Sequence, residues 1–210
     1  MVRLLQTLFI IILLPMWLLS NPLESSEVES DDNAKTIVKI NRHFLSIPSM
    51  KGEFIQFGPD GEKTSGQFYI QRPGKMRFDY HKPSPLTIKS DGRIVGVNNR
   101  KLRTWIFFPL DKTPLRFLLK EKINPDDQSI KSIKKDGQFI KIILRNKSVF
   151  GDSKITLMFD SLSYKLCQWT LTDHQGKETT IMVFNVENNV KLSKRLFGIN
   201  KITVEKNSNH

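Results

Sequence analysis

The sequence contains one cysteine, Cys167, among its 210 residues. A single cysteine cannot form an internal disulfide, so this chain must be held together by its core. Cys167 lies in the strand-like run KLCQWTL, where a small buried hydrophobic residue is expected rather than a nucleophile. The pattern excludes a disulfide-rich secreted module.

The sequence also lacks the short motifs of common active sites. It has no HExxH or GxSxG motif and no glycine-rich phosphate loop. The four histidines are scattered singly, without metal-ligand spacing, at His43, His81, His174 and His210. The sequence therefore favours binding over catalysis, with no enzyme activity, metal or other cofactor expected. A hydrolase with a fold-specific site is the alternative, and it would need a titrating residue in its cavity.

Tyrosine and tryptophan are scarce at three copies each, whereas phenylalanine occurs 14 times. A phenyl ring is large and has no polar group to satisfy. So many rings indicate either a large core or a cavity lined for an apolar guest.

The first 20 residues are predicted to be a secretory signal peptide, cleaved between residues 20 and 26. Arg3 precedes the apolar run LLQTLFIIILLPMWLL, which is short for a membrane span and is broken by Pro15. An uncleaved N-terminal anchor is the alternative. Export without disulfides favours the bacterial periplasm.

The charge of the chain is strongly basic, at +12 with a pI near 9.8. Five acidic residues gather in segment 21–33, which is predicted to be disordered. Export argues against nucleic acid as the partner of the basic remainder. Anionic lipid headgroups, an acidic partner protein and a merely solvated basic surface all remain open.

Two segments have helical patterns. In Ala34–Leu45, the residues Ile37, Ile40 and Phe44 share one helical face, with Asp32 or Asn33 as the expected cap. The run KTPLRFLLK, with a proline suited to a first helical turn, predicts a second short helix.

The rest of the chain follows a period of two and predicts about ten strands. The expected strands and hairpins fall at 52–57, 68–80, 86–99, 103–110, 132–144, 153–160, 164–173, 178–188 and 194–204. An antiparallel sheet this long must curl or close. The predicted fold is a single mainly-β domain over residues 34–205, with few helices available to cap the concave side of the sheet.

The stretch FYIQRPGKMRFDY contains an unusual row. Phe68 and Ile70 share one strand face, and the next residue on that face is the permanently charged Arg72. The chain then turns at Pro73-Gly74. An inward guanidinium requires hydrogen-bond acceptors, because an unpaired buried charge is costly.

Four elements follow one another along the chain: Phe54 and Gln56, then GQFYIQRPGKMRFDYHKP, then Ser90-Asp91-Gly92, then TPLRFLL. In this ordered set, and most clearly from Gly66 to Lys120, the chain resembles the periplasmic outer-membrane lipoprotein carrier (LolA-like) family. The resemblance implies an incomplete, curved antiparallel β-barrel with a helical lid over a hydrophobic cavity for acyl chains. It also implies that Arg72 tethers the lid in the empty state. The residues expected to line the cavity are Phe54, Phe68, Ile70, Met76, Phe78, Ile88, Trp105, Phe107, Phe117, Leu118, Leu157, Phe159, Trp169, Ile181 and Val183.

The resemblance further implies a periplasmic carrier that acts as a monomer and uses no cofactor. Its partners would be acylated lipoprotein cargo, an inner-membrane ABC lipoprotein-release complex and an outer-membrane lipoprotein receptor, with no role for nucleic acid. A lipid- or glycolipid-binding envelope sensor or carrier built on the same half-barrel is the alternative function.

Overall fold

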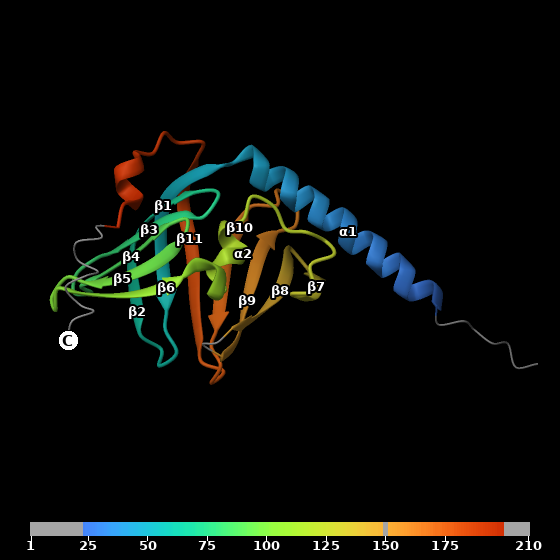
Figure 1. The fold of residues 1–210 in the computed structure, drawn as a ribbon. Coiled ribbons are helices and arrows are strands. Elements are labelled where there is room, and N and C mark those ends of the chain that lie inside the picture. Colours follow the sequence, from blue (N-terminus) through green and yellow to red (C-terminus); the bar gives the residue numbers. More distant parts are fainter. Residues whose placement is uncertain (1–22, 149–150, 200–210) are drawn as a thin grey trace, which may run out of the picture.

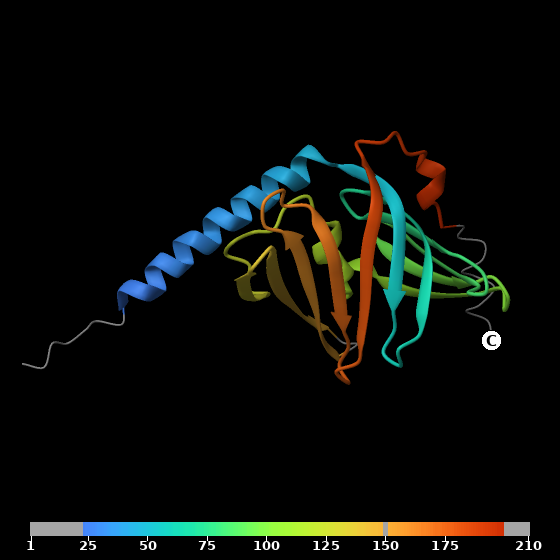
Figure 2. The same ribbon diagram turned by 180° about the vertical axis from the view of Figure 1, so that it is seen from behind.

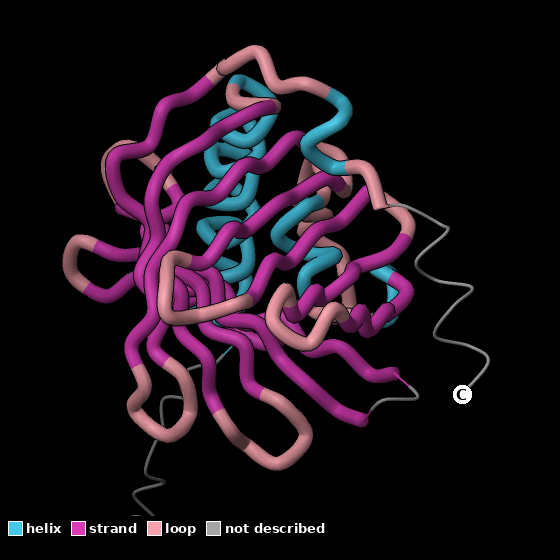
Figure 3. Tube along the Cα trace, turned by 90° about the vertical axis from the view of Figure 1, so that its left-hand side faces the viewer, coloured by secondary structure: helices cyan, strands magenta, loops and turns pink. Residues whose placement is uncertain are grey.

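An antiparallel sheet of eleven strands curls around two helices in the computed structural model, which describes residues 23–148 and 151–199 (Figure 3). The spatial order is β6-β5-β4-β3-β2-β1-β11-β10-β9-β8-β7, so β6 and β7 are the two edges. The strands are β1 Ser49–Phe57, β2 Lys63–Gln71, β3 Lys75–Tyr80, β4 Leu86–Asp91, β5 Ile94–Asn99, β6 Thr104–Pro109, β7 Ile130–Asp136, β8 Phe139–Ser148, β9 Gly151–Asp160, β10 Leu166–Thr172 and β11 Glu178–Asn188. The open, curled sheet confirms the predicted fold class.

The helical elements are α1 Leu23–Ser46, η1 Leu110–Lys112, α2 Leu115–Leu119 and η2 Lys194–Phe197. Helix α1 crosses the sheet, and its N-terminal part projects beyond the strands (Figures 1 and 2). Among the described residues, no helix is long and apolar enough to span a membrane. The expected signal peptide lies outside the described residues.

The start of α1 differs from the prediction. Residues 23–33 were expected to be disordered, with Asp32 or Asn33 as the cap, but the helix already begins at Leu23. Acidic side chains near a helix N-terminus interact favourably with the helix dipole. An ion pair between Asp31 and Lys35, with 2.5 Å between Oδ2 and Nζ, adds an i,i+4 contact. The acidic composition of this segment predicted disorder, whereas its charges are compatible with the helix that the structure shows.

The concave side of the sheet holds the core. In β3 the side chains alternate strictly, and Met76, Phe78 and Tyr80 are buried on the inner face. The inward rows of β2, β8 and β9 join them in one continuous cluster, which also includes residues from both helices. In these strands one face enters the cluster and the other faces outward. This explains why buried side chains recur at every second residue.

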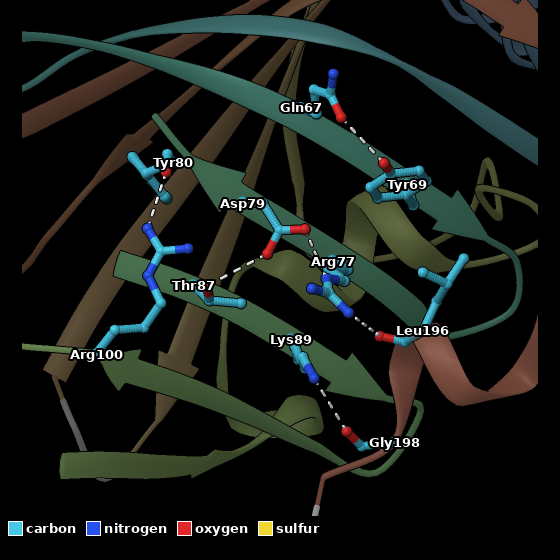
Figure 4. Close-up of polar contacts among 10 residues, drawn as sticks. All are labelled: Gln67, Tyr69, Arg77, Asp79, Tyr80, Thr87, Lys89, Arg100, Leu196 and Gly198. Atoms are coloured by element: carbon cyan, nitrogen blue, oxygen red, sulfur yellow. Dashed lines mark hydrogen bonds and ion pairs between the residues drawn. The ribbon is translucent and has the colours of Figure 1, made fainter. Parts of the chain in front are cut away.

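The outer face of β3 and β4 is covered by the C-terminal segment (Figure 4). The Arg77 guanidinium donates from Nη1 to the Leu196 carbonyl at 3.4 Å, and Lys89 Nζ donates to the Gly198 carbonyl at 3.4 Å. Phe197 is 2% exposed. A strand was predicted over residues 194–204. That prediction is wrong for Lys194–Phe197, which form the 3-10 helix η2, and residues 200–204 lie outside the described residues.

Candidate functional site

Two helical segments close the concave side of the sheet. Helix α1 buries Ile37, Ile40 and Phe44 against the strands. Residues 110–119, here called the α2 lid, comprise η1 and α2 and bury Phe117, Leu118 and Leu119. Both segments present the apolar side chains that their sequence patterns predicted, so the interior is enclosed by sheet on one side and by helices on the other.

Arg72 connects these two segments. Its side chain is 6% exposed. Nε donates to the Leu118 carbonyl of the α2 lid, and Nη1 donates to the Ile47 carbonyl just after α1, each at 3.3 Å. The guanidinium carbon lies 4.1 Å from the centroid of the Phe44 ring, a cation–π arrangement. Helix α1 and the α2 lid are together called the cover. A single side chain from the end of β2 therefore contacts both parts of it.

The environment of Arg72 is poorly suited to charge. Burial lowers the pKa of its guanidinium to about 10, so it remains protonated at neutral pH. Its third nitrogen, Nη2, is buried and has no hydrogen-bond partner among the described residues. Both hydrogen bonds are longer than the usual 2.9–3.0 Å. Arg72 is thus bonded to the cover, but neither tightly nor completely.

The turn after Arg72 fixes its position under the α2 lid. The Gly74 amide donates to the Leu119 carbonyl at 2.9 Å, and Ser90 Oγ donates to the Gly74 carbonyl at 2.7 Å. Gly74 has φ of +78°, and a Cβ there would lie 2.7 Å from Gly92 Cα. Only glycine combines this backbone conformation with such a close approach.

Helix α1 is also connected to the chain beyond the α2 lid. Asn41 Nδ2 donates to the Ile123 carbonyl and Asn41 Oδ1 accepts from the Ile123 amide, both at 2.7 Å. This paired contact joins α1 to the segment that follows α2. Helix α1 is therefore bonded to the chain that leaves the α2 lid, as well as packed against the sheet.

Aromatic rings fill the centre of the concave side. The Phe78 ring lies 4.9 Å from Phe54, 5.7 Å from Phe68 and 5.9 Å from Trp169, measured between ring centroids. At their edge Tyr80 donates to Gln56 Oε1 at 2.5 Å, and burial raises the pKa of Tyr80 to about 12. The interior is apolar and suited to a hydrocarbon guest.

The predicted cavity residues divide into two groups. Most belong to the buried cluster on the concave side or pack directly against it: Phe54, Phe68, Ile70, Met76, Phe78, Ile88, Phe117, Leu118, Leu157, Phe159, Trp169, Ile181 and Val183. Trp105 and Phe107 do not. The register pairs Phe107 with Gly96 and Trp105 with Asn98, which puts both rings on the face opposite to buried Val95. Their placement in the interior is therefore corrected.

The two tryptophans of the described chain give a direct test of this division. A brominated fatty-acyl probe bound inside should quench the fluorescence of Trp169, which is 2% exposed, and leave Trp105 unaffected, because quenching requires contact. The expected result is strong quenching in the Trp105→Phe variant of the mature protein and little in Trp169→Phe. The reverse pattern would place the probe on the outer face.

His43, in the last turn of α1, should make stability depend on pH. Burial lowers the pKa of His43, and the nearby charges of Arg72 and Lys165 lower it further. The unfolded chain binds this proton near the ordinary pKa of about 6.5. Stability should therefore fall as the pH drops through that value. The Tm of the wild type is expected to decline more than that of His43→Gln between about pH 7.5 and pH 5.5; equal declines would show that another group titrates.

Sequence reasoning did not identify Asn41 or Asn146 as site residues. Both interrupt apolar rows: Asn41 borders the buried face of α1, and Asn146 follows Ile140, Ile142 and Leu144 on the inner face of β8. A polar residue at an inward position was the available signal, as it was for Arg72.

Comparison with known proteins identifies the family. Residues 46–200 match the family described as outer membrane lipoprotein carrier protein LolA. An outer-membrane lipoprotein carrier protein of Methylococcus capsulatus is 30% identical over 161 residues, covering 72% of this chain and 77% of that protein. One from Alkalilimnicola ehrlichii is 33% identical over 76 residues, covering 34% of this chain and 36% of that protein.

Among solved structures, a LolA superfamily protein from Nitrosomonas europaea aligns with a TM-score of 0.42 and 10% identity, covering 78% of this chain and 98% of that one. The family match spans most of the chain, including Arg72 and the α2 lid. This protein belongs to the outer membrane lipoprotein carrier protein LolA family.

Proposed function

We propose that this protein carries lipoproteins across the periplasm by enclosing their acyl chains between the curled sheet and the helical cover. The observation that carries the proposal is the single apolar interior closed by α1 and the α2 lid, with Arg72 bonded to both. Such a site can bind hydrocarbon and release it without covalent chemistry, so the function is binding and transport rather than catalysis.

The energetics suit a carrier. Each buried methylene of an acyl chain contributes about 0.8 kcal/mol, so several chains require a protected interior during transit. The interior is packed with aromatic side chains. Cargo must therefore displace the cover, and the long hydrogen bonds of Arg72 oppose that opening only modestly.

Membership of the family supports the remaining parts of the proposal. Cargo is received from an inner-membrane ABC lipoprotein-release complex and passed to an outer-membrane lipoprotein receptor. The carrier is an exported periplasmic monomer, needs no cofactor, and depends on the release complex for the energy of extraction. The strongly basic composition, with a net charge of +12, is compatible with acidic surfaces on these partners.

A release assay tests the proposal. Purified mature protein would be incubated with spheroplasts, and the supernatant probed for acylated lipoprotein in a one-to-one complex. The expected result is lipoprotein in the supernatant only when the protein is added. If a fatty-acyl probe binds but no lipoprotein is released, a lipid sensor or glycolipid carrier of the same fold replaces the proposal. Binding of neither rejects both.

A further inference from the structure

The α2 lid has a second polar anchor, at the end opposite to Arg72. Asn146 of β8 is 1% exposed. Its Nδ2 donates to the Lys112 carbonyl at 3.0 Å, and its Oδ1 accepts from Arg116 Nε at 3.1 Å. Because a buried amide is costly without partners, these bonds fix Arg116 relative to the sheet. The lid is thus bonded to β8 through Asn146 and to β2 through Arg72.

Arg116 in turn faces a cavity of about 300 Å³ between the lid and the sheet edge. The cavity is lined by Arg116 of α2, Lys131 of β7, Arg145 and Lys147 of β8, and by Gln128 and Ser129 of the preceding loop. No carboxylate is among the lining residues. Four cationic side chains from three elements therefore surround one small space.

The charge at this cavity is only partly compensated. Arg145 donates from Nε and Nη2 to Asp152 of β9, and the nearby cations lower the pKa of the Asp152 carboxyl, Arg145 most strongly. Within the described residues, Arg116 makes one hydrogen bond, from Nε to Asn146, and its guanidinium also lies over the Phe117 ring. Its Nη1 and Nη2 remain as donors, and it faces three like charges.

We infer that this cavity binds a phosphate group that bridges the α2 lid to β7 and β8. A guanidinium fork, here Nη1 and Nη2 of Arg116, together with lysine ammonium groups is common recognition chemistry for phosphate. The buried Asn146 holds the Arg116 fork in place, as a preorganised site requires. Free phosphate and the phosphate of an anionic lipid headgroup share this chemistry.

Because the cavity lies between the lid and the sheet, an anion bound there should stabilise the closed lid. Only the closed lid brings Arg116 next to the cations of β7 and β8, so an anion between them binds the closed state preferentially. A ligand that prefers one state shifts the equilibrium towards it. Bound phosphate should therefore keep the lid closed and slow the loading of acyl chains, a consequence that rests on the proposed carrier function.

The test is an NMR titration of the mature protein with sodium phosphate, against sodium chloride at equal ionic strength. Phosphate is expected to shift the Arg116 Nε resonance and the amides of Leu115–Leu119 in a saturable manner. In Arg116→Gln and Lys147→Gln the apparent affinity should fall about tenfold, the loss typical of one charge-assisted contact. Lys101→Gln, in the β5–β6 turn far from β7 in the strand order, is the matched control and should titrate like the wild type.

Vesicles of phosphatidylglycerol and of phosphatidylcholine distinguish the two sources. Binding to phosphatidylglycerol that depends on Arg116 supports a headgroup, and binding of inorganic phosphate alone supports the free ion. A wild type that shows no saturable shift, or an Arg116→Gln variant that titrates normally, overturns the inference. So does Arg116-dependent binding of a glutamate-rich peptide without phosphate binding, which would make the cavity a protein contact.

The failure of this inference is separable from failure of the carrier function. If phosphate binds but no acyl probe does, the cavity stands and the carrier proposal falls. If both bind and phosphate does not change the association rate of the probe, the bridging of lid and sheet is refuted.

Discussion

Replacing Arg72 with leucine is expected to raise the affinity for a fatty-acyl probe about tenfold and to block the transfer of loaded lipoprotein to its receptor. Arg72 supplies the hydrogen-bond donors for the carbonyls of Ile47 and Leu118. Leucine would leave these carbonyls unpaired in the closed state, at about 1–3 kcal/mol for each that stays buried.

Two effects of this substitution on the closed state oppose each other, and their relative sizes decide whether the affinity for the probe rises or falls. Removing a buried guanidinium also removes its desolvation cost, which stabilises the closed state. That relief is limited, because the Phe44 ring at 4.1 Å and two carbonyls already offset part of the cost. The unpaired carbonyls remain only while the lid is closed. The closed empty state therefore loses more than the open loaded state, and cargo is held more tightly.

Titration with the probe and a transfer assay with purified receptor would measure the two effects. Arg72→Lys keeps the charge without the planar fork and should give an intermediate affinity. Arg100→Leu is the matched control, because Arg100 donates to carbonyls at the end of β3 (Tyr80) and in the loop that follows it (Ser84 and Pro85) and, among the described residues, to no carbonyl of the lid segments. Normal affinity and normal transfer by Arg72→Leu would count against Arg72 as the lid latch.

The sequence was most informative where one face of a strand is buried. The row Phe68, Ile70, Arg72 placed a charge among inward-facing side chains, and the structure finds all three buried. In the strand Thr104–Pro109, apolar residues occupy both faces, so alternation could not say which face is inside. Trp105 and Phe107 were expected in the interior, whereas the register with Gly96 and Asn98 puts them outside.

Carbonyls at a helix end or loop of the lid were the expected acceptors for Arg72, but which residues supply them could not be predicted. Any residue at positions 47 and 118 would present the same oxygen, so the sequence holds no signal for the contact. The role of Asn146 depends equally on tertiary structure, since Lys112 and Arg116 reach it only after the lid folds over β8. Local patterns gave the elements and their faces, but the polar contacts between lid and sheet arise from packing.

The second large effect concerns stability and compares one ring on each face of the sheet. Phe78→Ala is expected to lower the free energy of unfolding by about 3–5 kcal/mol, because it leaves a cavity in a close-packed cluster. Phe78 is 5% exposed and contacts Phe54, Phe68 and Trp169. Phe107 is half-buried outside that cluster and stacks on Trp105 alone, with a centroid distance of 5.6 Å.

Phe107→Ala should therefore cost only about 1–2 kcal/mol, since less apolar area is lost and water can fill the space. Urea denaturation of both variants at constant m-value would measure the difference. Equal losses would mean that the outer ring pair packs as tightly as the interior. A large loss confined to Phe78→Ala would instead show that stability and the proposed binding site share the same residues. Cargo would then have to replace the packing contacts that it disrupts, which couples loading to the stability of the empty carrier.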